Sequence, residues 1–127
     1  MTAPASGKTV LIVEDNELNA KLFRDLLHAR GHIVLERRDG LNIIATLQAE
    51  KPDLVLMDIQ LPEISGFDLI KMIKADPTVA AIPIIAVTAF AMKGDEERIR
   101  TSGCDDYLSK PISVASFIKK TTHYLGS

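Results

Sequence analysis

Short apolar runs alternate with longer amphipathic segments along the chain. The runs that we expect to be strands cover residues 9–13, 33–36, 54–57, 84–87 and 107–109. The segments that we expect to be helices cover residues 16–30, 41–48, 66–75, 95–101 and 113–124. In the first helical segment, Leu18, Leu22 and Leu26 recur every fourth residue, which is typical of an amphipathic helix. Gly31 is expected to end that helix.

This alternation predicts the fold class. Successive βα units place helices on both faces of a parallel sheet, and residues 54–57 are apolar throughout, as a strand buried on both faces should be. We therefore predict an α/β fold with a doubly wound, five-stranded parallel sheet flanked by five helices. The expected strand order is the flavodoxin-like order 2-1-3-4-5. Right-handed crossovers then place the first and third strands side by side.

Length and composition restrict the function classes. The chain has 127 residues, enough for one domain, and a net charge of −2. This charge gives no electrostatic basis for binding nucleic acid or an anionic membrane. No apolar run approaches the roughly 20 residues of a membrane span, and no signal-peptide pattern precedes the first strand, so we expect a cytoplasmic protein. Residues 1–8 are expected to form a flexible tail, and residues 9–125 the domain.

Residues with useful chemistry follow the predicted strands. They are Glu14, Asp15, Asp58, Thr88 and Lys110. Because the carboxyl ends of parallel strands meet at one edge, where ligands bind, we expect these side chains to converge. Three ionised carboxylates there repel one another by about 4 kcal/mol per pair at about 4 Å, with an effective dielectric constant of about 20. A bound Mg²⁺ would relieve this repulsion and would keep positions open for phosphate oxygens.

The same residues suggest phosphoryl chemistry. An aspartate beside a metal ion, a lysine ammonium and a threonine hydroxyl can attack phosphorus and stabilise the oxygens of the transferring group. Taken alone, Glu14 and Asp15 could instead cap the helix that follows, and Asp58 could be a turn residue. His28 and His32 are four residues apart, but the predicted helix ends between them, so we expect solvated surface rather than a metal site.

Several motifs, in this order, resemble the receiver domain of two-component response regulators. They are the acidic pair Glu14-Asp15, the run L-M-D-I-Q-L-P-E-I-S-G around Asp58, V-T-A-F around Thr88 and S-K-P-I around Lys110. Two runs, V-E-D-N-E-L-N and T-A-F-A-M-K-G-D-E-E-R-I-R, are similar to those of single-domain cell-division regulators of the DivK type. The resemblance covers the chain from about residue 9 to its end, and the ordered set is far more specific than any single motif.

The resemblance implies a phospho-acceptor and a metal site. Asp58 would accept the phosphoryl group, and Mg²⁺ would be held by Glu14, Asp15, Asp58 and the backbone carbonyl of Gln60. Many members of the family carry Asp at the position of Glu14. This departure leaves open whether Glu14 binds the metal directly or through water.

The resemblance also implies how the phosphoryl group is bound and sensed. Thr88 and Lys110 would bind its oxygens, and a cis bond between Lys110 and Pro111 would aim the lysine. Thr88 and Tyr107 would form the switch that responds to phosphorylation.

Protein partners follow from the same resemblance. They are a histidine kinase or histidine phosphotransfer protein as the phosphoryl donor and a downstream protein as the output, with no nucleic acid and no membrane insertion. Leu18 and Leu22 lie at the edge of the first helix's apolar arc, where we favour core packing over a docking patch for the donor. Phe90 and Met92 are large apolar residues in a loop, either tucked in or in contact with a partner.

We therefore predict a stand-alone receiver domain that is not an enzyme toward other substrates. It would catalyse only its own Mg²⁺-dependent phosphoryl transfer and slow dephosphorylation. One alternative is an interaction module that works without phosphorylation. A second is a phosphatase similar to haloacid dehalogenases, but the D-x-D run of that family is poorly matched by Asp15-Asn16-Glu17.

Overall fold

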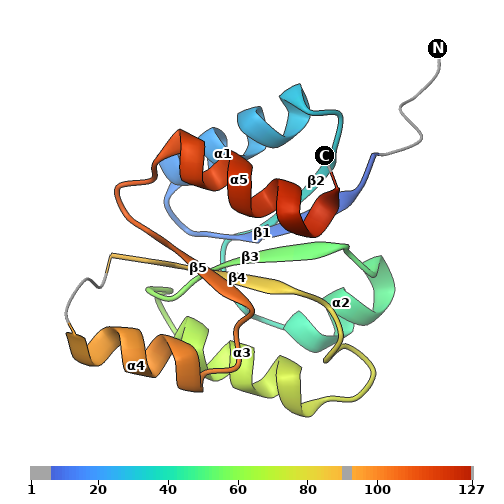
Figure 1. Ribbon diagram of the computed structural model, residues 1–127. Coiled ribbons are helices and arrows are strands. Elements are labelled where there is room, and N and C mark those ends of the chain that lie inside the picture. The colour runs from blue at the N-terminus through green and yellow to red at the C-terminus, as the bar shows by residue number, and fades with distance from the viewer. Residues whose placement is uncertain (1–6, 90–92, 127) are drawn as a thin grey trace.

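The five strands form one parallel sheet in the order β2-β1-β3-β4-β5, which confirms the predicted fold class (Figure 1). The strands are β1 (Thr9–Val13), β2 (Ile33–Arg37), β3 (Leu54–Asp58), β4 (Ile84–Thr88) and β5 (Asp106–Ser109). The helices are α1 (Glu17–Ala29), α2 (Ile43–Glu50), α3 (Gly66–Ala75), α4 (Lys93–Thr101) and α5 (Val114–Leu125). This computed structural model describes residues 7–89 and 93–126.

Helices cover both faces of the sheet, with α1 and α5 on one face and α2, α3 and α4 on the other (Figure 1). Successive residues of a strand point to opposite faces, so the apolar runs supply two cores. The core beneath α1 and α5 contains the strand residues Val10, Ile12, Leu54, Leu56, Ile85 and Val87. The core beneath α2, α3 and α4 contains Leu11, Val13, Val55, Met57, Ile84 and Ala86. Phe23 of α1 stacks on Phe117 of α5, with ring centroids 5.3 Å apart, which joins these two helices.

Short polar side chains fix where three helices begin. The side chain of Asn16 accepts a hydrogen bond from the backbone N–H of Asn19 at the start of α1. Ser65 and Ser113 cap α3 and α5 in the same way. Each cap satisfies one of the backbone N–H groups that have no partner within the helix. Gly31, with a φ of 84°, follows α1 in the left-handed conformation that glycine adopts readily.

The structure corrects three local predictions. Helix α2 begins at Ile43 rather than at residue 41, because Asn42 takes a left-handed conformation with a φ of 56°. Helix α4 begins at Lys93, two residues earlier than expected. His32 was expected at the solvated surface, but it is buried, and its Nδ1 accepts a hydrogen bond of 3.2 Å from the backbone N–H of Lys8.

Two predictions fall wholly or partly outside the described residues. Of the tail predicted over residues 1–8, only Gly7 and Lys8 are described. Phe90 and Met92, expected to be tucked in or to contact a partner, also lie outside the described ranges. Within residues 7–89 and 93–126, none of the helices combines the length and the apolar character needed to cross a membrane.

Candidate functional site

Two acidic residues, Glu14 and Asp15, follow strand β1 at the carboxyl edge of the sheet. The backbone N–H of Glu14 donates a hydrogen bond of 3.0 Å to the carbonyl of Arg37, which extends the pairing of β1 with β2 by one residue. Glu14 is buried and Asp15 is exposed. Asn16 provides the side-chain cap of α1, while Oε2 of Glu14 accepts a hydrogen bond of 3.2 Å from the backbone N–H of Asn16. Asp15 is therefore not needed as a cap.

Asp58 is the last residue of β3, the central strand, and is only 2% exposed. Its Oδ1 atom accepts a hydrogen bond of 2.9 Å from the backbone N–H of Gln60. The loop after it turns back closely, because the N–H of Gly66 donates a hydrogen bond of 2.9 Å to the carbonyl of Ile59. A Cβ atom on Gly66 would lie 2.3 Å from the carbonyl oxygen of Asp58. Only glycine fits there without moving the backbone of Asp58.

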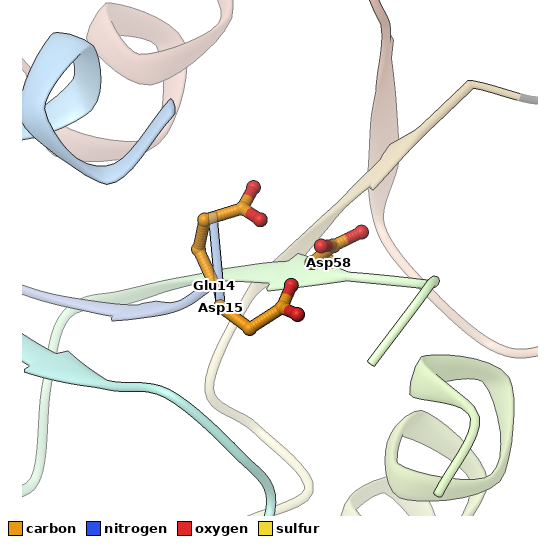
Figure 2. A group of neighbouring side chains, drawn as sticks. All are labelled: Glu14, Asp15 and Asp58. Carbon is orange, nitrogen blue, oxygen red and sulfur yellow. The ribbon is translucent and has the colours of Figure 1, made fainter. Parts of the chain in front are cut away.

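The three carboxylates meet at this edge, as the sequence predicted. Glu14, Asp15 and Asp58 each offer an oxygen within 4.8 Å of the others (Figure 2). The pKa of Glu14 is raised from 4.5 to about 7, chiefly by burial and then by a hydrogen bond with Asp58 and by the negative charge of Asp58. Among the described residues, Oε1 of Glu14 is buried without a hydrogen-bond partner.

Lys110 supplies the positive charge of the site. Its Nζ atom lies 3.5 Å from Oε1 of Glu14 and 3.4 Å from Oδ2 of Asp58. Its backbone N–H donates a hydrogen bond of 2.7 Å to the carbonyl of Thr88. The bond between Lys110 and Pro111 is cis, as the resemblance implied. One ammonium therefore contacts two carboxylates that arrive on different strands.

Thr88 and Tyr107 lie on the two strands beyond Asp58. Thr88 is the last residue of β4 and is fully buried. Tyr107, on β5, is opposite Ala86 in the register with β4 and packs, half-buried, against the core beneath α2, α3 and α4. Thr88, the expected hydroxyl donor, thus lies at the same sheet edge as Asp58, and the side chain of Tyr107 packs on the sheet face that α4 covers.

The donor set fits a small divalent cation. Carboxylate oxygens are the ligands that Mg²⁺ prefers, and one or two of them suffice because the ion keeps several waters. Asp15 and Asp58 are close enough to share an ion, and Oε1 of Glu14, which has no hydrogen-bond partner among the described residues, is a further oxygen at the same place. The backbone carbonyl of Gln60, the fourth expected donor, belongs to the loop that begins at Asp58.

The first helix presents a more exposed apolar surface than expected. Leu18 is 79% exposed, so our preference for core packing at this position is wrong. The buried residues of α1 are Ala20, Phe23 and Leu27, and at about 100° per residue Leu18 lies about 140° around the helix from Phe23, away from this buried side. Leu22 is half-buried beside it along the helix. A docking role for Leu18 and Leu22 is consistent with this exposure.

One contact at the edge of the site was not anticipated. Lys120 of α5 forms an ion pair with Asp106, donates a hydrogen bond to the carbonyl of Tyr107, and has its Nζ atom 4.8 Å from the centre of the Tyr107 ring. Sequence patterns gave no signal for this contact, because a lysine on the polar side of an amphipathic helix is expected to be solvated.

Comparisons with known proteins agree with this geometry. The profile of the response regulator receiver domain family matches residues 10–122. The chain is 58% identical over 119 residues to the polar-differentiation response regulator DivK of Brucella anthropi, covering 94% of this chain and 97% of that protein.

Solved structures share the fold. The receiver domain of a sensor histidine kinase from Pseudomonas aeruginosa matches with a TM-score of 0.84 and 33% identity, over 95% of this chain and 99% of that chain. That structure holds a magnesium ion coordinated in its active site cleft. The signal receiver domain of a histidine kinase from Syntrophus aciditrophicus matches with a TM-score of 0.86 and 28% identity, over 94% and 91% of the two chains. The chain therefore belongs to the family of response regulator receiver domains and is a response regulator of two-component signalling.

Proposed function

We propose that Asp58 accepts a phosphoryl group from a phosphohistidine of a partner protein. The observation that carries this proposal is the buried carboxylate of Asp58 with the ammonium of Lys110 3.4 Å from its Oδ2 atom. A carboxylate that only supported the fold would need no acidic neighbours. Here Glu14 and Asp15 lie beside it, an arrangement that suits a bound cation, and such a cation could neutralise the oxygens of a phosphoryl group.

The chemistry follows from the two oxygens of Asp58. Oδ1 accepts the N–H of Gln60, whereas Oδ2 faces Lys110 and is the oxygen that we assign as the nucleophile. Oδ2 forms a bond to phosphorus as the bond from phosphorus to the donor's imidazole nitrogen breaks. The electron pair of that bond stays on the imidazole nitrogen, and the product is an acyl phosphate. Lys110 and the hydroxyl of Thr88 would bind the oxygens of the transferring group.

We assign Glu14, Asp15, Asp58 and the carbonyl of Gln60 as the donors for Mg²⁺. When bound, Mg²⁺ neutralises charge on the carboxylates and on the phosphoryl oxygens. Asp15 is exposed and suited to direct binding, whereas Glu14 also contacts Lys110 through Oε1. This contact favours a water-mediated role for Glu14. The chain's own catalysis would be limited to its phosphorylation and slow dephosphorylation.

We further propose residues 9–125 as the receiver domain, preceded by a tail over residues 1–8. The relative DivK is named for polar differentiation, and we assign this chain a related role in cell polarity or division.

A histidine kinase or histidine phosphotransfer protein would dock on α1 at Leu18 and Leu22. Output would pass to a downstream protein through Thr88 and Tyr107. Phe90 and Met92 remain candidates for contacts with that partner, and the net charge of −2 supports a protein rather than nucleic acid.

Labelling with acetyl phosphate and Mg²⁺ tests the central assignment. We expect one phosphoryl group, located on Asp58 by mass spectrometry and absent when the metal is chelated. Asp58→Asn should abolish the label, while Glu63→Gln, which changes an exposed carboxylate five residues further on, should keep it. Label that persists in Asp58→Asn would exclude the proposal.

Two rival functions give different outcomes in the same experiment. An interaction module that works without phosphorylation would show no label that depends on Asp58. A phosphatase would release phosphate from generic phosphate esters with repeated turnover. The position of Asp58 at the end of the third strand, rather than on the first strand in a D-x-D run, argues against the phosphatase.

A further inference from the structure

The side chain of Lys120 reaches from α5 to the backbone and ring of Tyr107. Its Nζ atom donates a hydrogen bond to the carbonyl of Tyr107 and lies 4.8 Å from the ring centroid. The same atom lies 3.0 Å from Oδ1 of Asp106. That oxygen also accepts a hydrogen bond of 2.8 Å from the backbone N–H of Tyr107. Lys120 and Asp106 therefore contact Tyr107 at its N–H, its carbonyl and its ring.

These contacts matter because packing does not fully enclose Tyr107. The residue is half-buried on an edge strand, and one side of it rests against the core beneath α2, α3 and α4. Tyr107 and Lys120 also line a hollow of about 240 Å³. An ammonium over the face of an aromatic ring is attracted by the ring's negative face. The position of the ring thus depends on Lys120 as well as on apolar contacts.

We propose that Lys120 is a positioning residue that holds the Tyr107 ring in the position seen in this structure and so opposes a response to phosphorylation that moves the ring. This inference rests on the proposed role of Tyr107 as the switch. If phosphorylation of Asp58 moves the Tyr107 ring, the contact with Lys120 has to be lost or weakened. An interaction that stabilises the starting position then weakens the binding of any ligand that favours the other position, by at most the same factor.

Beryllofluoride with Mg²⁺ is the probe that tests this proposal, because it mimics the phosphoryl group on an aspartate. The amide signal of Gly66, which lies against the backbone of Asp58, reports the fraction bound. Labelling with fluorotyrosine gives a second signal at Tyr107, and Tyr124, the other tyrosine of the chain, serves as an internal reference. The quantity compared between variants is the beryllofluoride concentration at half-response.

Three variants separate the ring contact from general effects of charge. Lys120→Met removes the ammonium and keeps a long side chain. Lys119→Met removes the same charge from the exposed neighbouring residue and is the matched control. Lys120→Arg keeps a cation that can contact both the ring and the carbonyl. Each substitution is also made in a Tyr107→Leu background, where no aromatic ring is present.

We expect Lys120→Met to lower the half-response concentration by about two- to fivefold, the factor that corresponds to a cation–π contact at an exposed site. Lys119→Met should leave it unchanged, Lys120→Arg should restore it, and the effect should vanish in the Tyr107→Leu background. If the half-response concentration of Lys120→Met is unchanged or raised, or if Lys119→Met lowers it equally, the inference about Lys120 is wrong, while the assignment of Asp58 is unaffected. Failure of the wild type to bind beryllofluoride would overturn the assignment of Asp58 and this inference together.

Discussion

The carboxylates of Glu14 and Asp58 lie side by side in the interior, with Glu14 3% and Asp58 2% exposed. Two ionised carboxylates are costly in such a place, because burial weakens the hydration of each and their charges repel. The pKa of Glu14 is raised to about 7 as a result. Without a bound metal ion, Glu14 therefore changes from its protonated, neutral form to its ionised form near neutral pH.

The stability of the metal-free protein should fall as the pH rises from about 4.5 to about 7. The folded protein keeps a proton on Glu14 that the unfolded chain releases at its ordinary pKa of 4.5, so the unfolded state gains relative stability over this range. The full loss is about 3 kcal/mol at most. Urea unfolding with a chelator present, at pH values from 5 to 8, measures it. Glu14→Gln should lose this fall, whereas Glu63→Gln should retain it. A Glu14→Gln variant with the wild-type profile would contradict the prediction.

Asp15 should account for much of the stabilisation by Mg²⁺. A ligand that binds only the folded state stabilises it by about 2.7 kcal/mol at one hundred times its Kd. Asp15→Asn should reduce the rise in Tm that Mg²⁺ produces in the wild type. Without metal, the same variant should melt at a higher temperature than the wild type, because one of three neighbouring negative charges is gone. Equal shifts of both midpoints by Mg²⁺ would mean that Asp15 is not a ligand.

Gly66→Ala should disturb both stability and phosphorylation. The added Cβ would lie 2.3 Å from the carbonyl oxygen of Asp58, so backbone must move, and overpacking of this kind costs about 1–3 kcal/mol. We expect slower labelling by acetyl phosphate as Asp58 is displaced. Gly40→Ala is the matched control, since the three atoms nearest to its Cβ all belong to the side chain of Leu69, the nearest at 2.4 Å. It should lower the urea midpoint but leave the labelling rate of the folded protein unchanged. Similar labelling rates in both variants would contradict the prediction.

Leu18→Glu should slow phosphoryl transfer from a protein donor without affecting the fold. Leu18 is 79% exposed, so the free energy of unfolding should change by less than about 0.5 kcal/mol. The transfer rate from a phosphorylated kinase or phosphotransfer protein should fall about tenfold or more, as expected for a central interface residue. Labelling by acetyl phosphate should stay at the wild-type rate, because this small donor needs no docking surface. Met72→Glu, an exposed apolar position on α3 on the opposite face, is the control. A decrease of similar size in both variants would exclude a specific role of α1.

Most of the fold could be predicted from the sequence because the central strands are buried on both faces. Residues 10–13, 54–57 and 84–87 are apolar without interruption, as expected of strands in a parallel sheet that is covered on both sides. The predicted strand order was that of the flavodoxin-like doubly wound fold, in which right-handed crossovers place the first and third strands side by side. The convergence of Glu14, Asp58 and Lys110 followed in turn from the position of each at a strand end.

Other features depended on tertiary contacts that have no local pattern. His32 is buried, and its Nδ1 accepts a hydrogen bond from the backbone N–H of Lys8, which lies 24 residues earlier in the chain. The start of α2 depends on the left-handed conformation of Asn42, a conformation that asparagine adopts only in particular contexts. The exposure of Leu18 could not be predicted from periodicity alone, because the apolar side of α1 is wider than the part that is buried, which contains Ala20, Phe23 and Leu27.

The stacked rings of Phe23 and Phe117 connect α1 and α5 through the core between them, so these two helices should behave as one body. On the opposite face, Ile99 is the one buried apolar residue of residues 97–101 in α4. Structural change on phosphorylation should therefore concentrate on the α4 side and leave α1 as it was. A donor that recognises α1 would meet the same surface before and after transfer. Phosphoryl groups could then pass in either direction between this protein and its donor, and the relative amounts of the two phosphorylated proteins, rather than a change in recognition, would decide the direction.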